Sequence, residues 1–342
     1  MLAIVGATGA VGTVMRDVVS ARADLWGEVR LIASARSAGR MLPVRGEEVE
    51  VRALSAEAFD GVDIAMFDVP DEVSAAWAPV AAARGVVVID KSGAFRMDPE
   101  VPLVVPEVNP AQAFRRPKGI ISVPNCTTLS AIVVLGVLHQ AYRLRELVAA
   151  SYQAASGAGQ AGTESLYDQI AAVAGDRTLG QHRGDVRQAV GAAAEPFPAP
   201  LALNVIPWAG SLRPDGWSSE ENKIRDETRK ILGLPDLKIS ATCVRVPVIT
   251  GHSLAIHAVF DAEVDADQAR KLLGDAAGIA VVDQPEAARY PTPADVAGTD
   301  PTMVGRIRRS KDDPHALDLF VCGDNLRKGA ALNAAQIAEM LL

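Results

Sequence analysis

Cys126 is the residue whose type and position most clearly suggest covalent chemistry. It stands between the apolar run Ile120 to Val123 and a second apolar run, at helical spacing, from Leu129 to Leu138. A thiol at a helix start lies near free backbone N–H groups and the positive end of the helix dipole, which favour the thiolate. The same N–H groups stabilise an oxyanion on a carbonyl carbon under attack. Thr127 and Thr128 are predicted to cap this helix. A buried, inert cysteine is the competing interpretation.

A glycine-rich turn near the beginning of the chain is a second candidate site. Gly6-Ala7-Thr8-Gly9-Ala10-Val11-Gly12 follows the apolar run Leu2 to Val5 and opens a helical pattern. The glycines permit a tight turn and close approach of a pyrophosphate, and the helix N-terminus supplies N–H donors. The strand–turn–helix context makes the pattern more specific than glycine spacing alone, although an ordinary turn remains an alternative. The cofactor-binding residues predicted in this turn are Gly6, Thr8, Gly9, Ala10, Val11 and Gly12.

The end of the next apolar run, Val29 to Ala33, indicates which dinucleotide binds. An NAD site usually has Asp or Glu here to bind the ribose 2′-hydroxyl, whereas this chain has Ser34, Arg36 and Ser37. An arginine pairs with a 2′-phosphate, and the two hydroxyls add hydrogen bonds. We therefore predict NADP over NAD, with a solvated loop arginine as the alternative.

These residues need a scaffold, and the first third of the chain predicts one. Short apolar runs at 2–5, 29–33, 63–67, 86–89 and 120–123 read as buried strands, with helical patterns at 10–20 and 71–84. Such alternation is typical of a Rossmann-type, doubly wound parallel sheet in an α/β protein.

The rest of the chain has a different pattern. Strands are predicted at 147–154, 238–249, 253–260, 302–308 and 316–321, and helices at 163–172, 219–232 and 326–342. The runs 238–249 and 253–260 are expected to pair as an antiparallel hairpin around Thr250-Gly251. This indicates a second, α+β domain with a mixed sheet. We predict an NADP-binding domain over 1–127, completed by 323–342, and a substrate-binding, catalytic and dimerisation domain over 128–322.

Composition excludes several classes of protein. The chain has 342 residues, 49% of them hydrophobic, and a net charge of −8, so no basic excess exists for nucleic acid or a membrane surface. Its three cysteines are far apart, which indicates a reduced, intracellular protein, and we interpret Cys243 and Cys322 as structural. Neither a metal-binding spacing, a signal peptide nor a transmembrane stretch is recognised, so we expect no metal and a cytoplasmic location.

At this point a resemblance becomes specific, because ordered motifs along almost the full chain resemble bacterial-type aspartate-semialdehyde dehydrogenases. They are GATGAVG from Gly6, SARSAG from Ser34, SGAFR from Ser92, VPLVVPEVN from Val101, PNCTT from Pro124, SYQAASGAG from Ser151, EENK from Glu220, ATCVRVPV from Ala241, GHS from Gly251 and DNLRKGAALNAAQIAE from Asp324. Two segments depart from the family. Asp68-Val69-Pro70-Asp71 replaces a Ser-Ala-Gly-like turn, and Lys91 stands where the family often has Asn.

The resemblance implies NADPH-dependent reductive dephosphorylation of L-4-aspartyl phosphate to L-aspartate 4-semialdehyde through a thioester on Cys126. The reverse reaction is phosphorylating oxidation of the semialdehyde. The pathways implied are lysine and diaminopimelate, threonine, methionine and isoleucine biosynthesis. The family also implies a homodimer through the second domain, and in some members a tetramer.

The resemblance assigns roles to individual residues. His252 is implied as the acid/base, Arg245 as the ligand of the substrate α-carboxylate, and Glu220 as the ligand of its amino group. Arg96 and Lys223 are implied to bind phosphate, while Asn125 and Gln153 orient the substrate. Further cofactor contacts are expected from Ser156, Gly157 and Asn325. Without the resemblance, Glu220 and Lys223 read as an exposed helical ion pair, and His252 reads equally well as a structural residue.

Three other functions fit parts of the sequence less well. A short-chain dehydrogenase needs Tyr-x-x-x-Lys, and none of the four tyrosines has Lys four residues later. N-acetyl-glutamyl-phosphate reductases typically have a Gly before the cysteine, where this chain has Asn125. A nucleotide-binding protein with a dead active site predicts loss of Cys126, His252 or Arg245, and all three are present.

Overall fold

The computed structural model describes the backbone of residues 1–342 and the side chains of all of them except Ala23. The chain forms two compact units, each of which is discontinuous in sequence. The first contains Met1–Leu129, Asp226–Pro235 and Leu326–Leu342, and the second contains Ser130–Arg225 and Asp236–Asn325. The assignment of 226–235 to the first unit is not evident from the sequence, because the division falls in the middle of the helix Ser219–Leu232. None of the helices that the structure describes is long and apolar enough to span a membrane.

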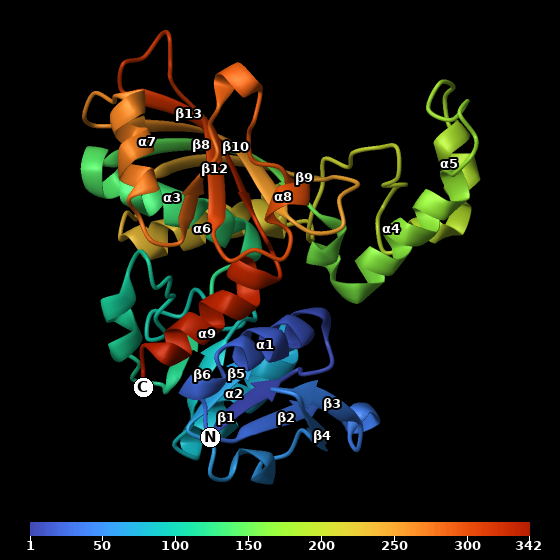
Figure 1. Ribbon diagram of the computed structural model, residues 1–342, viewed down its shortest axis with the longest axis vertical. Coiled ribbons are helices and arrows are strands. Elements are labelled where there is room, and N and C mark those ends of the chain that lie inside the picture. Colours follow the sequence, from blue (N-terminus) through green and yellow to red (C-terminus); the bar gives the residue numbers. More distant parts are fainter. The chain divides into compact units, whose positions relative to one another are not determined.

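A seven-stranded sheet forms the core of the first unit, with β1 at its centre (Figure 1). The strand order is β3-β4-β2-β1-β5-β6-β7, and all neighbours are parallel except the edge pair β3–β4. The bounds are β1 (Leu2–Val5), β2 (Val29–Ala33), β3 (Met41–Val44), β4 (Glu47–Ala53), β5 (Ile64–Phe67), β6 (Val87–Asp90) and β7 (Ile120–Ser122). Every residue of β1, β2 and β5 is buried, as expected for strands covered on both faces. The predicted Rossmann-type sheet is confirmed.

The β3–β4 hairpin is absent from the sequence prediction. Its two-residue turn is Arg45-Gly46, and both residues have positive φ, of 54° and 80°. Asn or Asp is the usual first residue of such a turn, so a turn that begins with Arg45 is not recognised from its residue types. The hairpin extends the sheet beyond β2 as an exposed edge.

Helices cover both faces of this sheet. From β1 the chain winds outward in opposite directions through α1 (Ala10–Ala21) and α2 (Asp71–Ala83), and right-handed crossovers place these helices on opposite faces. The final helical segment lies beside α1 (Figure 1). It begins with a π turn, Arg327–Ala331, before α9 (Leu332–Glu339), so the predicted uninterrupted helix is wrong in its first turn.

A buried cation explains how the π turn is held. Lys328 is 1% exposed, and its ammonium donates to Glu107, Asn333 and Gln336 at 2.7, 3.0 and 2.8 Å. All three N–H donors therefore have an acceptor, which a buried ammonium needs.

A six-stranded mixed sheet forms the core of the second unit, as predicted. The order is β11-β12-β13-β10-β8-β9, with parallel pairs at both edges and antiparallel pairs between them. The bounds are β8 (Leu144–Gln153), β9 (Lys238–Arg245), β10 (His252–Phe260), β11 (Ile279–Val281), β12 (Thr302–Arg309) and β13 (Ala316–Gly323).

The predicted hairpin between β9 and β10 is wrong. β9 pairs in parallel with β8, and β10 pairs with the other edge of β8. The connection crosses the end of β8, where Val246 N–H donates to Gln153 O at 3.0 Å and Ala155 N–H donates to Val248 O at 2.7 Å. Pro247 has no N–H to donate to a strand ladder, so β9 ends at Arg245 and not at Ile249.

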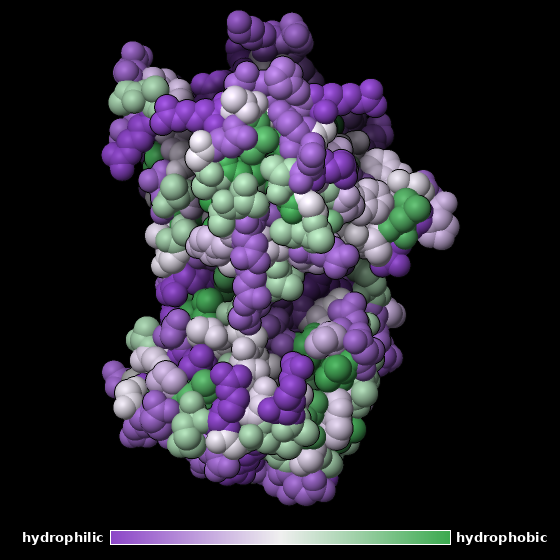
Figure 2. Space-filling view, turned by 90° about the vertical axis from the view of Figure 1, so that its right-hand side faces the viewer, coloured by the Kyte–Doolittle hydropathy of each residue, from purple (hydrophilic) through white to green (hydrophobic). Residues whose placement is uncertain are grey.

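The helices of the second unit are α3 (Cys126–Tyr142), α4 (Gly159–Val173), α5 (Asp185–Val190), α6 (Ser219–Leu232), α7 (Ala266–Gly274) and α8 (Pro293–Val296). They include α3 and α6, each of which also contributes residues to the first unit. Figure 1 shows α4 and α5 reaching away from the sheet as an arm. Figure 2, viewed from the side of that arm, shows hydrophobic side chains among polar ones.

One face of the second sheet leaves apolar side chains exposed. Residues of β8 alternate between buried and accessible, and Val148 and Tyr152 are 53% and 38% exposed. The ring of Tyr152 lies 6.0 Å from that of Phe320 on β13. His257 on β10 pairs with Asp318 at 2.9 Å on the same face, which fits its predicted structural role.

Candidate active site

The glycine-rich turn joins β1 to α1 and excludes larger residues. Gly6 has φ of +92°, and a Cβ there would lie 2.0 Å from Asp68 O. A Cβ on Gly12 would lie 2.2 Å from Gly6 O. Gly9 is the N-cap residue of α1, and no described side chain caps the helix, so its first N–H groups remain available to an anion. The turn therefore fits a dinucleotide pyrophosphate.

The three residues predicted to meet a 2′-phosphate lie just beyond the end of β2. Ser34 and Arg36 are exposed, whereas Ser37 is 8% exposed. Within the part of the chain that the structure describes, Arg36 has no ion-pair partner. An exposed guanidinium without a carboxylate partner suits a phosphate. The buried hydroxyl of Ser37 is less accessible to a ligand than that of Ser34.

An acidic side chain lies unexpectedly close to the glycine-rich turn. Asp68 follows β5, and one of its carboxylate oxygens lies 3.7 Å from the position of a Cβ on Gly9. Lys91, which follows β6, places its ammonium 3.2 Å from the other oxygen. The two departures from the family pattern therefore form one ion pair. Its cation offsets a negative charge that would repel a pyrophosphate.

Asp90 holds the start of the loop that carries Arg96. Its buried carboxylate accepts from Ser74 and Ser92 Oγ, both at 2.7 Å, and from Ser92 N–H at 3.0 Å. Burial raises the pKa of the Asp90 carboxyl, and these hydrogen bonds oppose the rise. The loop therefore leaves β6 in a defined direction.

Cys126 is the first residue of α3 and is partly exposed. Asn125 supplies the helix cap, because its Oδ1 accepts from Thr127 N–H at 2.9 Å and Thr128 N–H at 3.4 Å. The prediction that the threonine side chains cap the helix is therefore wrong. The Thr128 hydroxyl is buried and, among described residues, has no hydrogen-bond partner.

The other two cysteines have an environment unsuited to a nucleophile. Burial raises the pKa of the Cys243 thiol to about 12 and that of the Cys322 thiol to about 11. Both thiols therefore stay protonated at neutral pH, which agrees with their predicted structural role.

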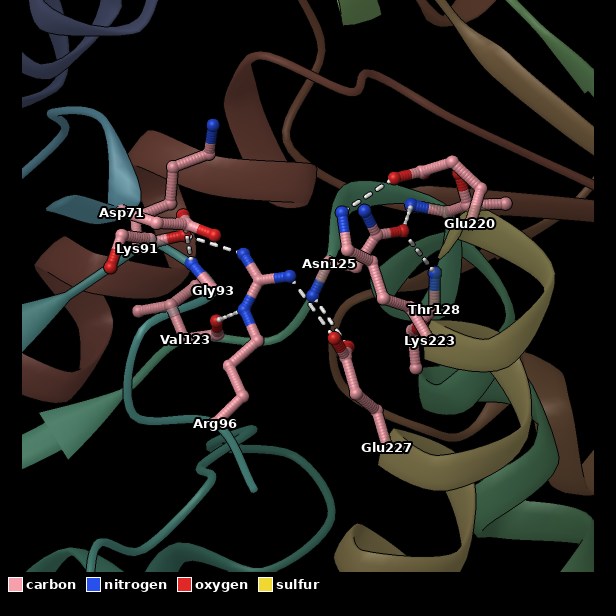
Figure 3. A network of polar contacts seen from close by, with 12 residues as sticks. Asp71, Lys91, Gly93, Arg96, Val123, Asn125, Thr128, Glu220, Lys223 and Glu227 are labelled. Atoms are coloured by element: carbon pink, nitrogen blue, oxygen red, sulfur yellow. Dashed lines mark hydrogen bonds and ion pairs between the residues drawn. The ribbon is translucent and has the colours of Figure 1, made fainter. Parts of the chain in front are cut away.

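A buried ion pair brackets the turn before Cys126 (Figure 3). Arg96 Nε donates to Val123 O at 2.9 Å, and its Nη1 lies 3.0 Å from Glu227 Oε1. Glu227 Oε2 accepts from Asn125 N–H at 2.6 Å. Arg96 was predicted to bind phosphate, whereas Glu227 is absent from the prediction.

Lys230 is a second residue that the sequence prediction omits. Its ammonium donates to the carbonyl oxygens of Arg96, Asp98 and Val101 at 2.6–2.8 Å. Burial lowers the pKa of Lys230. A signal was present in the sequence, because Glu227 and Lys230 follow Glu220 and Lys223 by seven residues each and so continue one helical face.

His252 and Arg245 lie together in the second unit. Arg245 Nη1 donates to Ala154 O at 2.7 Å, and His252 Nδ1 accepts from Ala154 N–H at 3.0 Å. A Cβ on Gly157 would lie 2.7 Å from Arg245 Nη1 and 3.1 Å from His252 Nε2, so a larger residue there would displace the guanidinium and crowd the imidazole. Because Nδ1 accepts, the neutral ring carries its proton on Nε2.

Asn325 supports the turn before His252. Its Oδ1 accepts from Gly251 N–H at 2.9 Å, and its Nδ2 donates to Ser156 Oγ at 2.9 Å. Ser156 and Asn325, both predicted to contact the cofactor, therefore bind each other beside the turn that precedes the histidine.

The Glu220 carboxylate accepts from two side chains of the second unit. Lys223 Nζ lies 2.7 Å from Glu220 Oε1, and Gln153 Nε2 donates to Glu220 Oε2 at 3.3 Å. Three predicted substrate-binding and phosphate-binding residues thus share one cluster (Figure 3 shows the Glu220–Lys223 pair). The carboxylate is mostly buried, at 12% side-chain exposure, so its charge acts in a medium of low dielectric constant.

Comparisons with known proteins agree with this division. A family model described as the NAD binding domain of semialdehyde dehydrogenases matches residues 1–115. A second model, described as the dimerisation domain of semialdehyde dehydrogenases, matches residues 135–328.

Individual relatives match over their whole length. An aspartate-semialdehyde dehydrogenase of Corynebacterium glutamicum is 49% identical, over 100% of this chain and 99% of that protein. One of Bacillus subtilis is 40% identical, over 99% and 96%. The crystal structure of aspartate semialdehyde dehydrogenase II from Vibrio cholerae, complexed with ASA, has a TM-score of 0.90 and 38% identity, covering 99% of this chain and 97% of that one. This chain belongs to the aspartate-semialdehyde dehydrogenase family.

Proposed function

We propose that this chain catalyses the NADPH-dependent reductive dephosphorylation of L-4-aspartyl phosphate to L-aspartate 4-semialdehyde, and its reverse. The observation that carries the proposal is the placement of Cys126. It is the partly exposed first residue of α3, after a turn capped by Asn125, in a chain of this family. The enzyme would serve lysine and diaminopimelate, threonine, methionine and isoleucine biosynthesis.

Cys126 is proposed to act as a thiolate nucleophile. Its sulfur bonds to the acyl carbon as the bond from that carbon to the phosphate oxygen breaks, which leaves a thioester and free phosphate. Bound NADPH supplies the hydride that reduces the thioester. The resulting tetrahedral carbon releases the thiolate and becomes the aldehyde. N–H groups in the first turn of α3 stabilise negative charge on the reacting oxygen.

His252 is proposed to act on the same oxygen. Because its Nδ1 accepts from Ala154 N–H, the neutral ring offers Nε2–H as a donor. It therefore stabilises the oxyanion of the tetrahedral species. In the reverse direction the same donor stabilises the oxyanion that forms when the Cys126 thiolate adds to the aldehyde carbon.

The substrate's charged groups each have a proposed partner. Arg245 binds the α-carboxylate, and Glu220 binds the α-ammonium. Because Lys223 already pairs with Glu220 at 2.7 Å, the substrate ammonium would replace Lys223 there and free it for the phosphate, for which Arg96 is the other proposed ligand. Asn125 and Gln153 orient the acyl group. Lys223 thus links amine recognition to phosphate binding.

We propose NADP as the cofactor, bound at the glycine-rich turn, with Ser34, Arg36 and Ser37 at the 2′-phosphate and Ser156, Gly157 and Asn325 near the nicotinamide end. The exposed guanidinium of Arg36, which has no ion-pair partner among the described residues, supports this choice over NAD. The domain matched by the dimerisation model is proposed to form a homodimer, and the accessible apolar face around Val148 and Tyr152 supports it. A cytoplasmic location follows from the proposed metabolism.

A single assay tests the reaction. The purified full chain is mixed with aspartate semialdehyde, phosphate and NADP, and formation of the reduced nicotinamide is followed by absorbance. We expect turnover that depends on phosphate and is faster with NADP than with NAD. Cys126→Ala should abolish turnover while cofactor binding, measured by calorimetry, persists. Absence of phosphate-dependent turnover in folded protein would refute the proposal.

A further inference from the structure

Glu227 joins two parts of the first unit that would act in different steps. One carboxylate oxygen contacts Arg96 Nη1 at 3.0 Å, and the other accepts from Asn125 N–H at 2.6 Å. Arg96 Nε completes the circuit by donating to Val123 O at 2.9 Å. The ion pair therefore makes hydrogen bonds to the backbone on both sides of Pro124, immediately before Cys126 (Figure 3).

Burial strengthens the attraction between the two charges of this ion pair and restricts the positions that their side chains can take. The side chains of Arg96 and Glu227 are 7% and 2% exposed. Water does not screen a pair at that depth, and a buried charge that loses its partner is costly. Neither group can therefore shift without the other, and Asn125 N–H shifts with both. The Asn125 side chain then caps α3 and so fixes the helix start that carries the thiol.

We propose that Glu227 is a positioning residue that holds the phosphate-binding guanidinium of Arg96 and the Cys126 turn in one arrangement. The inference rests on the proposed function. Glu227 acts through its neighbours and needs no contact with substrate. Its carboxylate has two separate consequences, one for phosphate binding through Arg96 and one for the chemical step through Asn125.

The carboxylate charge is essential to this role. In Glu227→Gln, an amide of the same size still accepts from Asn125 N–H, but its NH₂ group then faces the Arg96 guanidinium. Two donors cannot bond to each other, so Arg96 loses its charged partner, while the carbonyl oxygens of Val123 and Lys91 still accept from its guanidinium. Glu227→Asp keeps the charge but shortens the side chain by one methylene, so it can satisfy one partner well and not both.

Glu221 offers a matched control on the same helix. Its carboxylate also holds backbone groups, accepting from Ser218 N–H at 2.8 Å and Cys243 N–H at 3.1 Å. It contacts neither Arg96 nor the turn before Cys126. Glu221→Gln therefore removes a charged helix-borne acceptor of similar type without touching the proposed circuit.

The test is steady-state kinetics in the direction that consumes phosphate, on the full chain. For Glu227→Gln we expect the KM for phosphate to rise about tenfold or more and kcat to fall about tenfold, because small displacements of reacting groups carry such costs. The KM values for NADP and the semialdehyde should stay within about twofold. Glu227→Asp should recover part of the phosphate KM, and Glu221→Gln should leave every KM and kcat within about twofold.

Several results would overturn the proposal. Wild-type KM and kcat in folded Glu227→Gln would do so, as would a lower kcat with every KM unchanged, because a smaller active fraction gives that pattern. An equal rise in phosphate KM in Glu221→Gln would show a general helix effect. Should Glu227→Gln not fold, an unchanged phosphate KM in Glu227→Asp would be decisive. Failure of the proposed function is distinguishable, because the wild-type chain would then show no phosphate-dependent turnover.

Discussion

The ion pair between Asp68 and Lys91 makes a prediction about cofactor affinity that needs no catalysis to test. Lys91→Met removes the cation and leaves the Asp68 carboxylate beside the glycine-rich turn, 3.7 Å from the Cβ position of Gly9. NADPH should then bind more weakly, because the carboxylate repels the pyrophosphate without compensation.

The size of the effect follows from Coulomb's law. If a separation of about 6 Å is taken between a bound phosphate and the Asp68 carboxylate, two unit charges interact by about 0.7 kcal/mol in water and about 2.8 kcal/mol at an effective dielectric constant of about 20. The dissociation constant should therefore rise roughly 3- to 100-fold, with about tenfold as the central value. Asp68→Asn alone should bind NADPH at least as tightly as the wild type.

Isothermal titration of NADPH into the wild type, both single variants and the double variant provides the assay. The Asp68→Asn, Lys91→Met chain should bind within about threefold of the wild type, and the loss in Lys91→Met should shrink at 1 M salt, where the Debye length is about 3 Å. Undiminished affinity in Lys91→Met would refute the reasoning. A double variant as weak as Lys91→Met would instead mean that Lys91 contacts the cofactor directly.

Three further predictions concern reactivity and stability. Iodoacetamide at pH 8 should modify Cys126 and spare Cys243 and Cys322, because burial raises the pKa values of these two thiols to about 12 and about 11. Mass spectrometry of the folded chain measures the number of adducts, and more than one adduct would contradict this prediction. Because burial raises the pKa of Asp90, its contribution to the free energy of unfolding is full below the unfolded pKa and is lost as pH rises through the folded value. Urea unfolding should show this decline as pH rises above the ordinary pKa of an aspartate in the wild type and a shallower one in Asp90→Asn, so equal slopes would argue against it. Lys328→Met should lower the free energy of unfolding by about 3–5 kcal/mol, because it strands a buried carboxylate, and a loss below about 1 kcal/mol would contradict that reading of the buried cation.

Local patterns predicted the elements well where local chemistry sets their ends. The helix predicted at 219–232 matches α6 at both ends. Ser218 and Glu221 form a capping box, in which each side chain bonds to the other's backbone N–H at 3.2 and 2.8 Å. The continuous apolar runs of β1 and β2 likewise identify buried parallel strands.

Pairings between distant segments were not predictable from such patterns. Proximity in sequence suggested that β9 pairs with β10, but β8, whose sequence is about ninety residues away, lies between them. Glu227 was missed for the same reason. Its partners Arg96 and Asn125 are 131 and 102 residues away, so the seven-residue spacing from Glu220 indicates the helical face of Glu227 but not its partners. The family resemblance identified the residues assigned to the chemistry, but it gave no information about the residues that hold these side chains in position.

The discontinuous first unit has a consequence for the order in which the protein can fold during synthesis. Residues 1–129 leave the ribosome first, but 226–235 and 326–342 belong to the same unit and are made much later. Until Glu227 has been made, the Arg96 side chain lacks the partner with which it is buried. The Lys328 contacts to Glu107 form only near the end of translation. The nascent chain must therefore carry the strands of the nucleotide-binding sheet without the later segments of their unit for much of its synthesis, and a chain truncated before 326 would lack the α9 cover of that sheet.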